Sequence, residues 1–213
     1  MIHPFRFFYE SGITLNAGIK ADSLISLYKG VKKVSDSSLF YHLYHSYYRR
    51  HFTTFEHMND FSSWIWENLG QQFISEKIAI INPLLFNSIK DCRDHLLNCL
   101  QEYVVSGDMF PRVPKGREFF FLEIKSFVLP TGLEAFDLKE FKKGIDKASL
   151  SVLFFHLISS KIRIGHESND FSEWLNNELQ LHDIAAEIET LNIFSSNLWE
   201  IKKRIIKIID KNK

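Results

Sequence analysis

The chain of 213 residues carries 26 basic and 26 acidic side chains, so its formal net charge is zero. A neutral chain lacks the overall field that draws proteins to nucleic acid or to an anionic bilayer. Its 20 Phe, 7 Tyr and 4 Trp supply enough aromatic area for a well-buried core, which argues against disorder outside the termini. The length allows one domain or two small ones.

Membrane and export signals are lacking in the sequence, where no apolar run approaches the roughly 18 residues that span a bilayer. The N-terminus shows no basic segment followed by an apolar one, so we expect no signal peptide. Cys92 and Cys99 are seven residues apart, which on a helix separates them by about 10 Å, too far for a disulfide. Reduced thiols favour a cytoplasmic protein.

The first elements are predicted in chain order from aromatic density and helix signals. The opening segment FRFFYESGITL is predicted to be extended, because Phe is dense there and a turn signal follows at Gly18. A short helix is expected to begin near Ser23 and to end near Gly30. A longer aromatic helix then carries His42, and the phrase NDFSSW begins another helix with Asp60 as its N-cap.

The same order of signals recurs later in the chain. At an offset of 114 residues Phe5 matches Phe119 and His42 matches His156. After the gap that follows the histidine, the offset becomes 110 and NDFSSW matches NDFSEW, whose Asp170 is again the predicted cap. Each half closes with a helix that has one apolar stripe, formed by Ile89, Cys92, Leu96, Cys99, Leu100 and Tyr103, and by Leu198, Ile201, Ile205, Ile208 and Ile209.

These matches predict an internal duplication. The expected class is mainly α, with two tandem homologous helical repeats at residues 1–105 and 118–213 and a linker at 106–117. Each repeat is opened by an aromatic extended segment. Such segments are too short to be stable alone, so we expect the two to pair in a small sheet.

Candidate site residues cluster where the histidine helix meets the Asn-Asp phrase. The predicted pocket comprises Tyr41, His42, Tyr44, His45, Asn59 and Asp60, with His156, Asn169 and Asp170 as the equivalents in the second repeat. The competing interpretation is structural, with the aspartates capping helices and the histidines satisfied in the core. We favour the structural interpretation, because a capping residue before an apolar helix face explains the phrase.

Other chemistries have weaker support. His42, His45, His51 and His57 could suggest zinc, but only His156 aligns firmly in the second repeat, so no metal and no cofactor are expected. Tyr47, Tyr48, Arg49 and Arg50 combine aromatic and basic side chains as single-strand nucleic-acid binders do. One Arg pair on a neutral chain is a weak footprint, so this is the third hypothesis.

The order of landmarks resembles a known family. An aromatic opening, Gly18-x-x-Ala21, FYHL, NDFSSW and the Asn82-Pro83 turn resemble a prokaryotic family of uncharacterised proteins, a domain of unknown function with a Tyr-His pair before an Asn-Asp-Phe-Ser-x-Trp motif. The resemblance covers nearly the whole chain, although Asn192 lacks the following Pro. It implies a soluble bacterial or archaeal protein with sugar-handling enzymes encoded nearby, and it transfers no active residues.

Three functions remain open at this point. The first is a non-catalytic helical module that binds another protein, supported by the lack of any catalytic motif in the sequence. The second is an enzyme or small-ligand binder, linked to carbohydrate metabolism, with a His/Asp/Tyr pocket in the first repeat. The third is the nucleic-acid binder. We expect no membrane partner and leave a homo-oligomer open.

Overall fold

The computed structural model describes residues 3–49, 59–86, 88–105, 112–164, 168–193 and 196–212. The chain divides into two compact units. Unit 1 combines Met1–Ser11 with Ser126–Lys213, and unit 2 is Gly12–Lys125. Each unit therefore takes its strand segments from two distant parts of the sequence.

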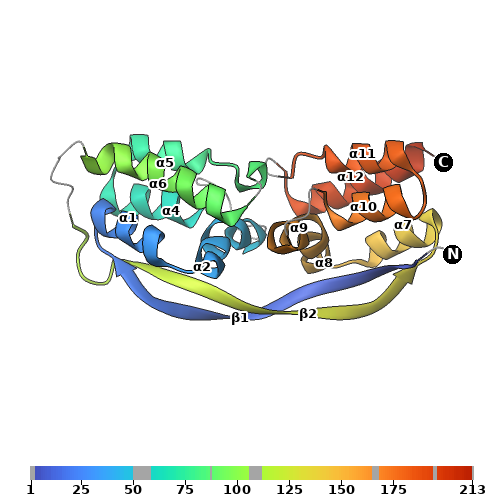
Figure 1. Cartoon of the computed structure of the whole chain (residues 1–213), viewed down its shortest axis with the longest axis horizontal. Coiled ribbons are helices and arrows are strands. Elements are labelled where there is room, and N and C mark those ends of the chain that lie inside the picture. Colours follow the sequence, from blue (N-terminus) through green and yellow to red (C-terminus); the bar gives the residue numbers. More distant parts are fainter. Residues whose placement is uncertain are drawn as a thin grey trace. The chain divides into compact units, whose positions relative to one another are not determined.

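Two long strands, β1 (Phe5–Ala21) and β2 (Phe119–Ala135), pair with each other as a two-stranded sheet. They run antiparallel, since Arg6 near the start of β1 donates to Glu134 near the end of β2 at 3.0 Å (Figure 1). Phe5 and Phe7 are buried while Arg6 between them is exposed, which is the alternation expected of a strand with one covered face.

Helices make up the rest of both units (Figure 1). In unit 2 they are α1 (Leu24–Lys33), α2 (Asp36–Phe40), η1 (Tyr41–His45), α3 (Ser46–Arg49), α4 (Asp60–Trp64), η3 (Ile65–Leu69), α5 (Gln72–Ala79), η4 (Pro83–Leu85) and α6 (Ile89–Val105). In unit 1 they are α7 (Leu138–Lys147), α8 (Leu150–Phe154), η5 (Phe155–Ser159), α9 (Ser160–Ile164), α10 (Asp170–Asn177), α11 (His182–Glu189) and α12 (Leu198–Lys211). The turns η1, η3 and η5 are wide π-helical turns, and η4 is a 3-10 turn.

The predicted fold class is wrong. The chain is not a mainly α protein made of two tandem helical repeats but a mixed α/β fold with a two-stranded sheet, shared by a solved structure of the same fold. The opening segments extend past Gly18 and Gly132, which take positive φ inside strands that continue to Ala21 and Ala135. Pairing along 17 residues supplies the backbone hydrogen bonds that short extended segments would lack.

The predicted division at residues 1–105, 106–117 and 118–213 follows chain order and stays a prediction. The compact units are arranged differently, because the first residues of β1 belong with helices α7–α12 and the first residues of β2 belong with α1–α6. Residues 106–111 of the predicted linker lie outside the part of the chain that the structure describes.

In each unit, a phenylalanine ring from a strand packs against a glycine inside a helix. A Cβ added to Gly30 would lie 2.3 Å from the Phe121 ring, and one added to Gly144 would lie 2.3 Å from the Phe7 ring. The prediction that the first short helix ends near Gly30 is wrong. Helices α1 and α7 continue to Lys33 and Lys147, and the glycines sit inside them because only a missing side chain leaves room for the ring.

Two further element predictions, the start of the first short helix and the buried stripes of the closing helices, agree with the structure at most positions. Helix α1 begins after Ser23, which caps it. The closing helices bury most of the predicted stripes, namely Cys92, Leu96, Cys99, Leu100, Leu198, Ile201, Ile205 and Ile209. The other predicted members, Ile89, Tyr103 and Ile208, are only partly buried. Both cysteines are free thiols in this core.

Candidate functional site

The repeated Asn-Asp phrase begins a helix in both units, but the capping residue differs from the predicted one. Asn59 is the N-cap of α4 and accepts from the Ser62 N–H at 3.0 Å, as Asn169 does for α10 from the Ser172 N–H at 3.0 Å. Asp60 and Asp170 are each the first helical residue instead. The prediction of aspartate caps is wrong by one position, because the amide oxygen of asparagine already occupies the capping place.

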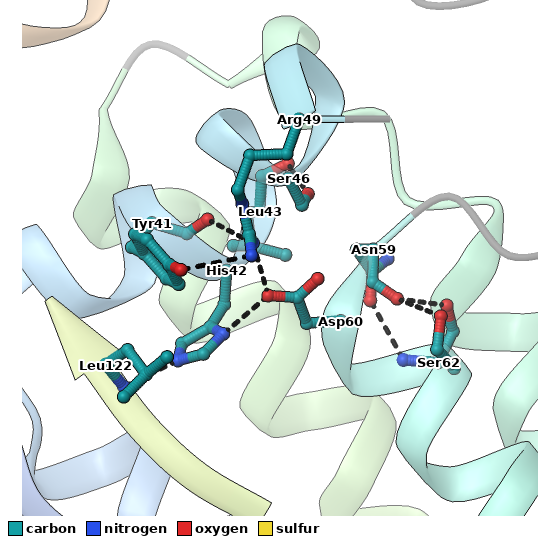
Figure 2. Close-up of polar contacts among 10 residues, drawn as sticks. Tyr41, His42, Leu43, Ser46, Arg49, Asn59, Asp60, Ser62 and Leu122 are labelled. Atoms are coloured by element: carbon teal, nitrogen blue, oxygen red, sulfur yellow. Dashed lines mark hydrogen bonds and ion pairs between the residues drawn. The ribbon is translucent and has the colours of Figure 1, made fainter. Parts of the chain in front are cut away.

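Asp60 is thereby available to the histidine helix (Figure 2). His42 Nδ1 and Asp60 Oδ2 are 2.8 Å apart, and the backbone N–H of Leu122 on β2 donates to His42 Nε2 at 2.9 Å. The imidazole is only 2% exposed. His42 therefore connects a helix turn, a helix start and a strand within unit 2.

This geometry determines the tautomer of His42. Because Nε2 accepts a backbone N–H, it has no proton, so the proton of the neutral ring is on Nδ1 and is donated to Asp60. Burial lowers the pKa of His42, and the Asp60 carboxylate offsets this only in part. Burial by itself would raise the pKa of Asp60, but the bonds with His42 and the Arg49 charge outweigh it and lower that pKa.

Arg49 on α3 completes the set in unit 2. Its Nη2 donates to the same Asp60 Oδ2 at 2.6 Å, and its Nη1 donates to the Tyr41 hydroxyl at 3.1 Å. The guanidinium carbon lies 4.1 Å from the centre of the Tyr41 ring, within cation–π range. Nearby, Ser46 donates to the Leu43 carbonyl inside the same helix (Figure 2). The guanidinium and the carboxylate therefore neutralise each other.

Unit 1 contains the corresponding contacts. His156 Nδ1 and Asp170 Oδ2 are 2.6 Å apart, and the backbone N–H of Phe8 on β1 donates to His156 Nε2 at 2.9 Å. Burial lowers the pKa of His156, with Asp170 opposing the shift. Here Ser160 Oγ donates to the other carboxylate oxygen of Asp170 at 2.8 Å, where unit 2 uses Arg49. The His–Asp arrangement is therefore the same in both units, and only its surroundings differ.

The arrangement is better suited to holding strands than to chemistry. A general acid or base must reach a substrate with a nitrogen that can gain or lose a proton. Both ring nitrogens of His42 and of His156 are already bonded to protein groups, and both rings are buried. In each unit a tryptophan also bonds the backbone just before a strand begins, because Trp64 donates to the Arg117 carbonyl and Trp174 to the His3 carbonyl, each at 2.8 Å.

The remaining predicted pocket residues have core or capping roles. Tyr44 is buried, donates to the Pro83 carbonyl at 2.8 Å and stacks on Phe40. His45 stacks on Tyr41 with ring centres 5.6 Å apart. Asn59 is 2% exposed and donates its amide to the Ile78 carbonyl. The structure thus brings together Tyr41, His42, Arg49 and Asp60, but not Tyr44.

Several candidate residues are outside the described part of the chain, namely Arg50, His51 and His57. Among the residues that the structure describes, no group of three or more His, Cys, Asp or Glu could hold a metal. Of the aromatic residues proposed for nucleic-acid stacking, Tyr47 is only 9% exposed and Tyr48 packs near His45 at 5.5 Å between ring centres. Tyr47 is therefore too buried to stack on nucleic-acid bases.

A cavity of about 560 Å³ lies on unit 1 between α10 and α11. It is lined by Ser168, Ser172, Glu173, Asn176, Asn177, His182, Ala185, Ala186 and Glu189. None of the predicted site residues lines it. One of its two carboxylates is already bonded within the protein, because Glu189 accepts from Lys161 at 3.0 Å and from the Asn169 backbone at 3.1 Å.

Sequence reasoning missed two features. The backbone partners of the histidines, at Leu122 and Phe8, leave no trace in residue type. The exposure of Phe73 on α5 and of Ile80, the residue that caps its C-terminus, at 81% and 76%, was also missed. The sequence contains a signal for the second feature. The positions 110 residues after Phe73 and Ile80 hold the polar residues Asp183 and Thr190, which are typical of an exposed helix face.

Fold and site together define a mixed α/β protein in which buried His–Asp pairs attach strands to helices. The chain belongs to a family of unknown function, DUF5752, whose model matches residues 2–210 as one unit. That single match does not show the tandem copies or the motif details expected from the sequence. A comparison with curated proteins finds no match.

A solved structure has the same fold. The structure of OrfY from Thermoproteus tenax superposes with a TM-score of 0.85 and is 24% identical, covering 98% of this chain and 95% of that one. At this identity the likeness concerns the fold alone. Within the described residues, no helix is both long enough and apolar enough to cross a membrane.

Proposed function

We propose that this chain is a non-catalytic module that binds another protein through the exposed face of α5 in unit 2. The observation that carries the proposal is the exposure of Phe73 and Ile80. They are seven residues apart, which places them on one face of the helix about two turns from each other. Aromatic and aliphatic side chains exposed together on one face are typical of interaction sites.

Unit 1 supplies an internal comparison for this face. At the matching positions it has Asp183 on α11 and Thr190 at the C-cap of that helix, and both residues are exposed as well. The buried positions are kept apolar in both helices, with Ile74 and Ile78 matching Ile184 and Ile188. Polar residues are therefore compatible with this helix position, so the apolar pair of unit 2 is not needed to build the fold.

The ligand-binding or enzymatic alternative has less support. It requires His42 and Asp60 to present reactive atoms to a pocket, but His42 is buried with both nitrogens bonded. Asp60 is engaged by both His42 and Arg49. The nucleic-acid alternative loses Tyr47 to burial and rests on Arg49, which is paired with Asp60. A link to carbohydrate metabolism has no observation in its favour here.

The test is affinity capture of the tagged chain in its native cells, followed by mass spectrometry. The double variant Phe73→Asp with Ile80→Thr installs the polarity that unit 1 has at these positions. It is expected to lose the captured protein while keeping the thermal unfolding midpoint within a few degrees, since both side chains are mostly exposed. The control is Ile25→Asp, which puts the same charge on an apolar residue of α1 that is 42% exposed. Equal capture by the wild type and the double variant would contradict the proposal.

A further inference from the structure

The apolar pair on α5 is accompanied by acidic residues. Glu76 is exposed and lies three residues after Phe73 and four before Ile80, so it is a neighbour of both on the helix surface. Glu67 is exposed on η3, which packs against α5. The apolar pair therefore has the Glu76 carboxylate as its neighbour on the helix surface, and the turn that packs against α5 contributes the second exposed carboxylate, Glu67.

The basic side chain near this face already has an acidic partner. Lys77 is the basic residue of α5, and its ammonium is paired with Glu102 on α6. Glu102 remains 62% exposed, so that pair adds no net positive charge to the surface. Gln72 donates to Glu76 at 2.8 Å, which orients the carboxylate without neutralising it. The surface therefore has a formal charge of −2, from Glu67 and Glu76.

The size of the apolar pair restricts the occupant. An exposed Phe and an exposed Ile together offer on the order of 300 Å². A stable dimer of folded proteins needs roughly 800 Å² from each partner. A pair spaced by two helical turns, about 10 Å, is instead matched by one face of a single helix.

We infer that this face binds an amphipathic helical segment of another protein, with leucine-like residues on one side and Lys or Arg beside them. The apolar side of that helix covers Phe73 and Ile80, and its basic residues approach Glu76 and Glu67. The charges supply partner choice and association rate, whereas the apolar contact supplies most of the affinity. The inference rests on the proposed function and adds the chemistry of the partner to it.

The experiment uses two fluorescent 14-residue peptides, one a Leu/Lys amphipathic helix and the other the same helix with Glu in place of Lys. Anisotropy titrations with the full chain are expected to give at least tenfold tighter binding for the Leu/Lys peptide. The variant Phe73→Asp with Ile80→Thr is expected to weaken that binding at least tenfold, and Ile25→Asp to leave it within twofold. The variant Glu67→Lys with Glu76→Lys is expected to reverse the preference between the peptides.

Three outcomes would overturn the inference. The first is equal binding of the two peptides. The second is binding of the Leu/Lys peptide that survives the change Phe73→Asp with Ile80→Thr. The third is a concentration-dependent dimer in sedimentation that this variant abolishes, which would assign the face to a second copy. Native capture that depends on Phe73 and Ile80, combined with no peptide preference, would overturn the basic-helix inference and leave the proposed function standing. Capture that is independent of them would overturn the proposed function itself.

Discussion

His42 and His156 each hold a strand amide with one ring nitrogen and an aspartate with the other. The neutral ring is required for this, because a protonated Nε2 would face the N–H of Leu122 or Phe8 with a second donor. Protonation therefore removes one hydrogen bond in each unit and places a positive charge in a buried site.

This requirement predicts a pH dependence of stability. Each histidine has its pKa lowered in the folded chain, so the unfolded chain takes up protons first as the pH falls. The free energy of unfolding is expected to be constant well above pH 6.5, about the ordinary pKa of imidazole, and to decrease as the pH falls from there towards the lower pKa values of the folded chain. Urea titrations between pH 7.5 and pH 5 measure this slope.

Two matched variants test whether the buried histidines, and not an exposed one, cause the pH dependence of stability. His42→Gln with His156→Gln is expected to flatten the slope, since the glutamine oxygen can accept the strand amide without titrating. His182→Gln changes an exposed histidine of α11 and is expected to leave the slope unchanged. A slope that persists in the His42→Gln and His156→Gln chain would contradict the role assigned to the buried pairs.

Gly30 and Gly144 predict a second residue-scale effect. Alanine favours an ordinary helix interior over glycine by about 1 kcal/mol. Here the added methyl group would meet the Phe121 or Phe7 ring at 2.3 Å, so Gly30→Ala is expected to destabilise the chain by about 1–3 kcal/mol. Lys29→Ala, at an exposed position of α1, is the control and is expected to change stability by less than about 0.5 kcal/mol. Chemical denaturation would decide, and a stabilised Gly30→Ala chain would refute the packing argument.

At the scale of elements, the helix starts depend on asparagine. Asn59 caps α4 and also donates to the buried Ile78 carbonyl, whereas Asn197 caps α12 through its bond to the Glu200 N–H alone. Asn197→Ala is expected to cost about 1 kcal/mol. Asn59→Ala is expected to cost about 1–3 kcal/mol more, because it leaves a buried carbonyl without its donor. Equal losses in urea denaturation would mean that the Ile78 bond contributes nothing.

Helices α5 and α11 show, at the same scale, that the residues on the exposed face of a helix can change while its buried face stays the same. Both bury isoleucine at matching positions, Ile74 and Ile78 in one and Ile184 and Ile188 in the other. Their outer faces differ, with Phe73 and the C-cap residue Ile80 exposed at α5, and Asp183 and the C-cap residue Thr190 exposed at α11. Burial constrains only the inner face, so the outer face is free to acquire a binding role.

At the scale of the whole molecule, each compact unit contains strand residues from two distant parts of the chain. Unit 2 takes its buried aromatic pair, Phe119 and Phe121, from the start of β2. A fragment of residues 12–125 includes this pair, whereas a fragment of residues 1–105 lacks it. The former is expected to unfold cooperatively with a helical circular dichroism spectrum, and the latter to be largely unfolded.

The physical reason is the area lost from the core. Removing two buried phenylalanines costs about 3–5 kcal/mol each, which is a large part of the stability of a domain this small. Cooperative folding of residues 1–105 with no gain from residues 106–125 would show that the helices need no strand from β2. Circular dichroism melts of both fragments at equal concentration provide the comparison.

Local features were predictable where one physical cause acts on neighbouring residues. The apolar stripe of α6, the start of α1 near Ser23 and the start of a helix at the Asn-Asp phrase all follow from spacing and side-chain type. The exact cap was missed because Asn59 and Asp60 are both good capping residues, and the choice between them depends on His42. That histidine is 18 residues away in sequence, so no local pattern contains the contact.

By itself, the sequence determined the amphipathic faces, the aromatic core and the reduced cysteines, because residue type and spacing decide which apolar side chains can be buried together. Only the tertiary structure decided the mixed α/β class, the position of Phe121 against Gly30 and the closed bonding of both histidines. These depend on backbone groups and on segments about 80–150 residues apart, whose meeting is set by strand pairing. The sequence predicted that the two opening segments pair, but it did not predict the 17-residue length of the paired strands or the contacts that depend on it.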